Sequence, residues 1–175
     1  MKFTVAVSTL LLAGAFTGCK TPEPEMMGNL HHELDPGSFY LPSAEGSRVV
    51  SVATNGVGVA NILVQTQRVA VKEGGPKETI EKFGEVYAFS PNFFAAHRDE
   101  PTQIRFWNLQ PDDNHAFMLI GPQGQVLMNI WLPPLKDTAY VFTFHREGLF
   151  NFVCALHPAV MFGQNLVLPP RTATQ

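Results

Sequence analysis

Four side chains of this 175-residue chain could together bind a metal ion. Cys154, His157 and Met161 lie within eight residues of one another, directly after a strand-like run, and His115 lies 39 positions upstream of the cysteine. They offer one thiolate, two imidazole nitrogens and one thioether. Such a mixed set suits a metal that changes its oxidation state, because thiolate satisfies the softer ion and imidazole the harder one.

The order His…Cys-x2-His-x3-Met is the ligand set of a blue-copper electron-transfer centre. It resembles the cupredoxin family, which includes plastocyanin, azurin and amicyanin, and the resemblance is strong over about residues 85–170. The resemblance implies one type-1 copper per chain, held by His115, Cys154 and His157. Met161 is then the weak axial ligand, whose loss would move the redox potential more than it would abolish copper binding.

The residues before the first histidine match the same family. Residues 106–108 (Phe-Trp-Asn), followed by a polar loop at 109–114, resemble the aromatic-x-Asn strand end that precedes this ligand in cupredoxins. The ligand loop departs from any single relative, since its Cys-to-His spacing resembles plastocyanin and amicyanin and its His-to-Met spacing resembles azurin. Several relatives have an Asn directly after the first histidine. Here Ala116 takes that place, and Asn114 could substitute for the Asn.

Each proposed ligand has a plainer interpretation. Cys154 could be a buried, apolar-like cysteine, and Met161 could fill space in the core. Either imidazole could belong to an ordinary loop histidine. His97 and His145 lack the sequence context of a ligand and are interpreted as surface or structural residues, with His145 as the reserve if His115 does not bind.

Three classes of function remain open. The leading hypothesis is one-electron transfer, with redox proteins docking near the copper site. The alternative is a copper storage or delivery protein, which the pair His31-His32 and the six methionines modestly favour. An enzyme that uses Cys154 as a nucleophile lacks an obvious residue to orient its base, so we expect no enzyme. A structural zinc site would need four strong ligands.

The N-terminus predicts export and a lipid anchor. Residues 1–18 combine a basic start with an apolar run that is too short to span a bilayer, which is typical of a signal peptide. Phe16-Thr17-Gly18-Cys19 resembles a bacterial lipoprotein processing site, which implies lipidation of Cys19 and a periplasmic or cell-surface, membrane-anchored protein. An ordinary secretory peptide that is cut elsewhere is the alternative. Residues 19–48 are expected to form a flexible tether, because they are rich in Pro, Gly, Glu and Ser.

Composition supports a copper role for the remaining cysteine. The chain has two cysteines, so lipidation of Cys19 leaves Cys154 without a disulfide partner, and metal binding would protect its thiol from oxidation. The formal charge of −3 gives no indication of nucleic-acid binding. We expect a monomer.

The elements that must position the ligands are short strands separated by turn signals. Alternating or apolar runs predict strands, and 77–83 followed by Gly84 predicts a short helix. The pattern favours an all-β, Greek-key sandwich of the cupredoxin type over residues 49–170, with a tail at 171–175. An apolar collar that keeps water from the metal is expected from four residues: Phe152, Leu156, Pro158 and Phe162. The expected strands are 49–52, 60–71, 85–90, 102–109, 116–120, 125–130, 139–145, 149–154 and 164–168.

Overall fold

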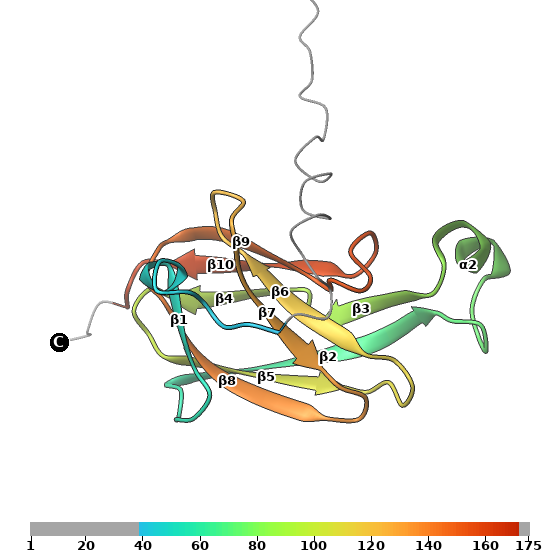
Figure 1. Cartoon of the computed structure of the whole chain (residues 1–175), viewed down its shortest axis with the longest axis horizontal. Coiled ribbons are helices and arrows are strands. Elements are labelled where there is room, and N and C mark those ends of the chain that lie inside the picture. The colour runs from blue at the N-terminus through green and yellow to red at the C-terminus, as the bar shows by residue number, and fades with distance from the viewer. Residues whose placement is uncertain (1–38, 172–175) are drawn as a thin grey trace, which may run out of the picture. The chain divides into compact units, whose positions relative to one another are not determined.

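The computed structural model describes residues 39–171, which form two five-stranded sheets and one short α-helix (Figure 1). The strands are β1 (Val50–Ala53), β2 (Ala60–Ala70), β3 (Val86–Ser90), β4 (Phe93–His97), β5 (Thr102–Asn108), β6 (His115–Ile120), β7 (Val126–Leu132), β8 (Asp137–Phe144), β9 (Gly148–Val153) and β10 (Phe162–Leu168). The helices are the 3-10 turn η1 (Gly46–Arg48) and α2 (Lys77–Phe83).

The two sheets have the orders β1-β8-β5-β2-β3 and β4-β10-β9-β6-β7. Most neighbours are antiparallel, but β2 pairs with β5 and β4 pairs with β10 in parallel. The chain therefore crosses repeatedly between the sheets, and Figure 1 shows β5 and β8 on one side of the molecule and β9 and β10 on the other. This arrangement confirms the predicted all-β sandwich with one short helix.

Alternation along the strands explains why the two sheets pack. In β5 the side chains of Ile104 and Phe106 are buried, whereas Arg105 and Trp107 between them face outward. Phe117 of β6 lies at the centre of an aromatic cluster, with its ring centroid 4.6 Å from that of Phe106. Aromatic pairs of this kind contribute about 0.5–1.5 kcal/mol each beyond the area that they bury. The core between the sheets is thus held largely by phenylalanines.

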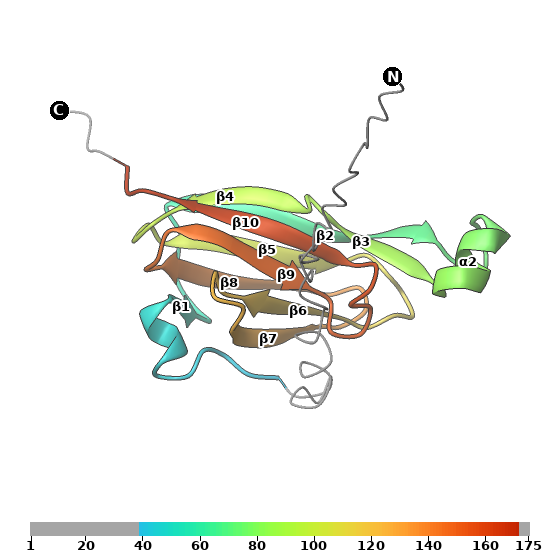
Figure 2. The ribbon, with the colours of Figure 1, turned by 90° about the horizontal axis from the view of Figure 1, so that it is seen from above.

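Helix α2 belongs to an extension of the β2–β3 hairpin rather than to the core. It has the bounds that the sequence predicts, and none of its residues is buried. It ends at Gly84, whose backbone N–H donates to the Ile80 carbonyl at a φ of 73°, a conformation that favours glycine. Figures 1 and 2 show the helix beyond the ends of β2 and β3, away from the packed sheets.

Part of the expected tether is folded against the sandwich. The backbone N–H and carbonyl of Tyr40 both bond with Asn129 of β7, at 2.9 Å and 3.0 Å, and η1 then leads into β1. The predicted signal peptide, Cys19 and the His31-His32 pair lie outside the described residues, as does the end of the tail. Within residues 39–171, no helix is long and apolar enough to cross a bilayer.

Candidate metal centre

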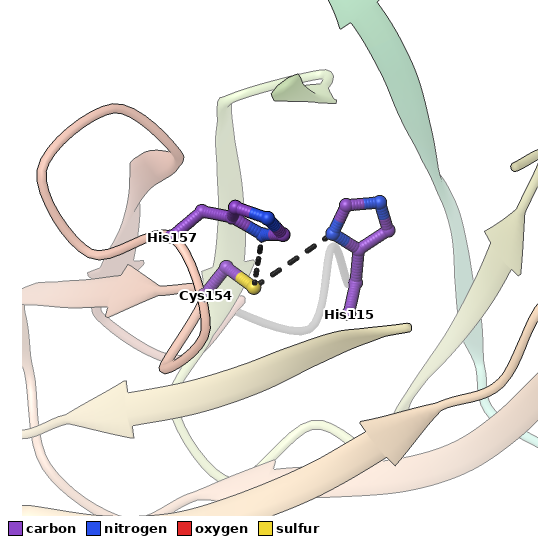
Figure 3. Close-up of side chains that lie close together, drawn as sticks. All are labelled: His115, Cys154 and His157. Atoms are coloured by element: carbon purple, nitrogen blue, oxygen red, sulfur yellow. Dashed lines mark hydrogen bonds between the residues drawn. The ribbon is translucent and has the colours of Figure 1, made fainter. Parts of the chain in front are cut away.

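Three of the four predicted ligands meet at one end of the sandwich. His115 is the first residue of β6, Cys154 directly follows β9, and His157 lies in the loop from β9 to β10. Because β6 and β9 are antiparallel neighbours, the start of one strand and the end of the other lie at the same end of the sheet. Figure 3 shows both imidazoles next to the sulfur of Cys154.

The distances fit a single bound ion. The Sγ atom of Cys154 lies 3.8 Å from Nδ1 of His115 and 3.6 Å from Nδ1 of His157 (dashed lines in Figure 3). A zinc ion, for example, bonds to Cys sulfur at about 2.3 Å and to His nitrogen at about 2.05 Å. When the S–metal–N angle lies between the tetrahedral and the trigonal value, these bond lengths separate sulfur from nitrogen by about 3.6–3.8 Å. All three donor atoms lie within 4.8 Å of one another. Their spacing and chemistry therefore fit a metal such as copper.

Backbone hydrogen bonds fix the sulfur and its loop. The N–H of Ala116 donates to Sγ of Cys154 at 3.3 Å and so ties the two ligand segments together. The N–H of Cys154 donates to the Met161 carbonyl at 2.8 Å, and the N–H of Met161 donates to the His157 carbonyl at 2.9 Å. Asn114, which could have substituted for the missing Asn, is exposed, and Ala116 makes the link through its main chain. A loop closed in this way limits ligand movement when a metal binds or changes charge.

Burial shifts the acid–base equilibria toward neutral side chains. His115 is fully buried, and burial, helped by the nearby His157 ring, lowers its pKa to about 4, against the opposing effect of Asp113. Burial also lowers the pKa of His157, again opposed by Asp113. Both imidazoles are consequently neutral at pH 7, the form that binds a metal. Burial raises the pKa of the Cys154 thiol, although backbone N–H groups at Ala116, Leu156 and His157 partly counteract it.

Tyr87 and Asp113 are two residues near the imidazoles that the sequence analysis did not identify. The ring of Tyr87 in β3 lies with its centroid 4.8 Å from that of His115 and 4.9 Å from that of His157. Its hydroxyl donates a short hydrogen bond to the carboxylate of Asp113. A lone aromatic in a strand carries no sequence signal for such a role, because the contact depends on how β3 lies relative to both ligand segments.

Asn108 supports the loop that delivers His115. Its Nδ2 donates to the carbonyls of Asp113 and Leu132 at 2.8 and 2.9 Å. Its Oδ1 accepts bonds from the Thr66 hydroxyl and the Gln110 N–H at 2.7 and 3.0 Å. The Asn of the aromatic-x-Asn motif is therefore a fully bonded, buried link between β5 and the polar loop.

The remaining predicted residues have different surroundings. Met161 is fully buried beside the ligand loop, and its role as axial ligand stays a prediction. Phe152 is also fully buried and faces the core, so it adds nothing to the exposed apolar surface around the ligand loop. It lies on the inward side of β9, whereas Phe162, the first residue of β10, is 59% exposed. Leu156 is half-buried and Pro158 is exposed.

The other described histidines lie outside the cluster. His145 bonds through Nε2 with the Ser51 hydroxyl and through Nδ1 with the Asp99 carboxylate, at 3.0 and 2.9 Å. His97 bonds through Nδ1 with the Pro169 carbonyl. Both have the structural or surface roles that the sequence favours, and the grouping of donors found in residues 39–171 does not include them.

The structure is similar to several solved auracyanins. It matches auracyanin B with a TM-score of 0.49 and 13% identity, over 70% of this chain and 99% of that one. A reduced auracyanin from Roseiflexus castenholzii matches with a TM-score of 0.48 and 14% identity, over 65% and 100%. Auracyanin A of Chloroflexus aurantiacus, described as a "blue" copper protein, matches with a TM-score of 0.43 and 17% identity, over 62% and 98%. No protein-family model and no curated protein matches the sequence.

The chain's own topology and site define the class of fold. Its two sheets have the mixed, crossing order given above, and its donors lie where β6 begins and β9 ends. These features make the chain a cupredoxin-like β-sandwich, as the His…Cys-x2-His-x3-Met motif predicts.

Proposed function

We propose that this protein binds one type-1 copper ion and carries single electrons between redox partners. The observation that supports the proposal most directly is the convergence of Cys154, His115 and His157, with S–N separations of 3.6 and 3.8 Å at a buried position. Copper would supply the one-electron couple when it is bound. The chain would supply two neutral imidazoles, one thiol and a loop whose backbone bonds hold the donors in place.

Burial of the donors favours an electron carrier over a copper delivery protein. Cys154 and His115 are each 0% exposed, and His157 is only half-buried. A delivery protein must let an acceptor's ligands reach the metal, which is difficult when two of the donors are inaccessible to solvent. Electron transfer needs only a close approach, which the partly exposed side of His157 allows.

We further propose that a redox protein docks over the exposed side of the ligand loop. Phe162 at 59% exposure, the half-buried Leu156 and the exposed Pro158 provide apolar surface there, and His157 offers the most accessible donor. The sequence of residues 1–19 supports export with a lipid on Cys19, so that the domain would meet its partners at a membrane surface.

A copper titration tests the metal site. Purified protein that lacks residues 1–19 is mixed with one equivalent of Cu(II), and the visible spectrum is recorded. We expect an intense sulfur-to-copper charge-transfer band that Cys154→Ser abolishes and that His145→Asn, a change outside the cluster, retains. Binding of copper without this band, or a band that survives in Cys154→Ser, would refute the site.

A second measurement separates carrier from delivery protein. The electron carrier is expected to show a reversible one-electron couple and to lose Cu(I) slowly to an excess of a Cu(I) chelator. Rapid transfer of Cu(I) to the chelator, together with an irreversible couple, would favour copper delivery.

A further inference from the structure

A buried tyrosine packs against both proposed imidazole ligands. Tyr87 is 1% exposed, and its ring meets those of His115 and His157 at interplanar angles of 66° and 53°. The two imidazoles are themselves only 5.1 Å apart, measured between centroids. The Tyr87 ring therefore packs against both imidazole rings. It belongs to β3, in the sheet opposite to the one that contains β6 and β9.

The hydroxyl of this tyrosine holds a carboxylate beside the site. It donates to Asp113, two residues before His115, while the main-chain carbonyl of Asp113 accepts a bond from Asn108 at 2.8 Å. Asp113 is thus bonded at both its side chain and its main chain, and it is only partly exposed. Its charge acts on both imidazoles, since Asp113 opposes the lowering of pKa at His115 and at His157.

The neighbouring acids are arranged differently. Asp112 has a side chain that is 65% exposed and forms an ion pair with Arg68 at 3.1 Å, so that both solvent and a cation offset its charge. The carboxylate of Glu85 accepts a bond from the main-chain N–H of Lys72, and its charge opposes the lowering of the pKa of His157. Asp113 is the acid that is hydrogen-bonded to Tyr87, whose ring contacts both imidazoles.

We propose that Tyr87 and Asp113 form a positioning pair, in which the tyrosine holds a fixed negative charge beside the metal and thereby stabilises Cu(II) relative to Cu(I). This inference rests on the proposed function. Cu(II) carries one more positive charge than Cu(I), so a nearby carboxylate favours the oxidised form, and the low dielectric of a buried site strengthens the effect. Tyr87 acts through Asp113 by holding its carboxylate with the hydrogen bond from the tyrosine hydroxyl.

Reduction potentials of matched variants test the pair. We expect Asp113→Asn to raise the preference for Cu(I) over Cu(II) by about tenfold or more. For one electron, a tenfold change corresponds to a rise in the reduction potential of about 59 mV. Tyr87→Phe should give a smaller rise, because the carboxylate remains but loses its anchor. Adding Tyr87→Phe to Asp113→Asn should give no further change. The control Asp112→Asn removes the same charge one residue away and should alter the preference less than threefold.

A redox-inert ion provides a second readout. Asp113→Asn should weaken Zn(II) binding by about tenfold, whereas Asp112→Asn should leave it within threefold, because a fixed anion favours any divalent cation at the site. Tyr140→Phe, which removes a buried hydroxyl elsewhere in the sandwich, controls for a general loss of stability. Unfolding midpoints and the charge-transfer band report whether each variant keeps its fold and site.

The outcomes separate this inference from the proposed function. A wild-type protein without the charge-transfer band contradicts the proposed function, and the Zn(II) measurements then still decide the electrostatic inference. Equal effects of Asp113→Asn and Asp112→Asn in both measurements overturn the inference and leave a type-1 site intact. A full effect of Tyr87→Phe in the Asp113→Asn background shows that the tyrosine acts on the imidazoles directly, and it also overturns the pair.

Discussion

Replacing Asn108 by alanine should destabilise the metal-free domain severely. The substitution removes four hydrogen bonds, two donated to the carbonyls of Asp113 and Leu132 and two accepted from Thr66 and Gln110. A typical bond contributes about 0.5–1.5 kcal/mol net, and a buried partner that is left unpaired adds about 1–3 kcal/mol unless water reaches it. We expect Asn108→Ala to lower the free energy of unfolding by about 3–5 kcal/mol, a large part of the 5–15 kcal/mol typical of a domain.

Urea unfolding of the metal-free protein at pH 7 measures this loss. Asn108→Asp adds a sharper test, because it keeps the acceptor for Thr66 but turns a carboxylate oxygen toward two carbonyls. It should be at least as unstable as Asn108→Ala. Asn61→Ala removes an exposed amide from β2 and should stay within about 0.5 kcal/mol of the wild type. A loss below about 1 kcal/mol in Asn108→Ala would show that Asn108 is not the link between β5 and the loop before His115.

Three further changes test the packing, the electrostatics and the axial position. An added Cβ at Gly163 would come within 2.3 Å of the Phe152 ring, so Gly163→Ala should lower the free energy of unfolding by about 3 kcal/mol or more. The control Gly74→Ala places its Cβ in open space and should leave the stability unchanged. Equal unfolding midpoints for the two variants would contradict this prediction. Burial lowers the pKa of His115 from 6.5 to about 4, so the unfolded chain binds a proton there before the folded domain does. The free energy of unfolding of the metal-free domain should therefore be highest above pH 6.5 and fall by about 3 kcal/mol as the pH drops to 4. Urea unfolding measured over this range should show the fall, and His115→Gln should show a smaller one. Met161→Leu should keep copper and the charge-transfer band while raising the reduction potential, and an unchanged potential would show that Met161 only fills space.

The sequence predicted those parts of the fold that local patterns encode. The run at 102–109 was expected to form a strand and corresponds to β5, and the run that ends before Gly84 identified α2 with its correct bounds. The metal centre could be anticipated because two of its donors, Cys154 and His157, lie close together in sequence, in a motif whose spacing is informative. The expected strands at 116–120 and 125–130 likewise correspond to β6 and β7, which pair with each other in antiparallel fashion.

What the sequence could not give depends on contacts between distant segments. Strand β4 was not predicted, because its parallel pairing with β10 has no local signal. The contacts of Tyr87 with both imidazoles require β3 to lie across from the ligand loops. Phe152 was expected in the apolar collar around the metal, but its ring packs in the core between the sheets, next to Phe94 and Phe117.

The position of β10 has a consequence for how the chain matures. Among the described strands, β4 bonds within its sheet only with β10, which is the last of them along the chain, and Cys154 and His157 lie in the segment just before β10. A nascent chain that ends before Cys154 therefore lacks both β10 and two of the three converging donors, even though His115 has already been made. Metal capture and completion of the sandwich should coincide, so that a truncated chain gains no metal-dependent protection from proteolysis.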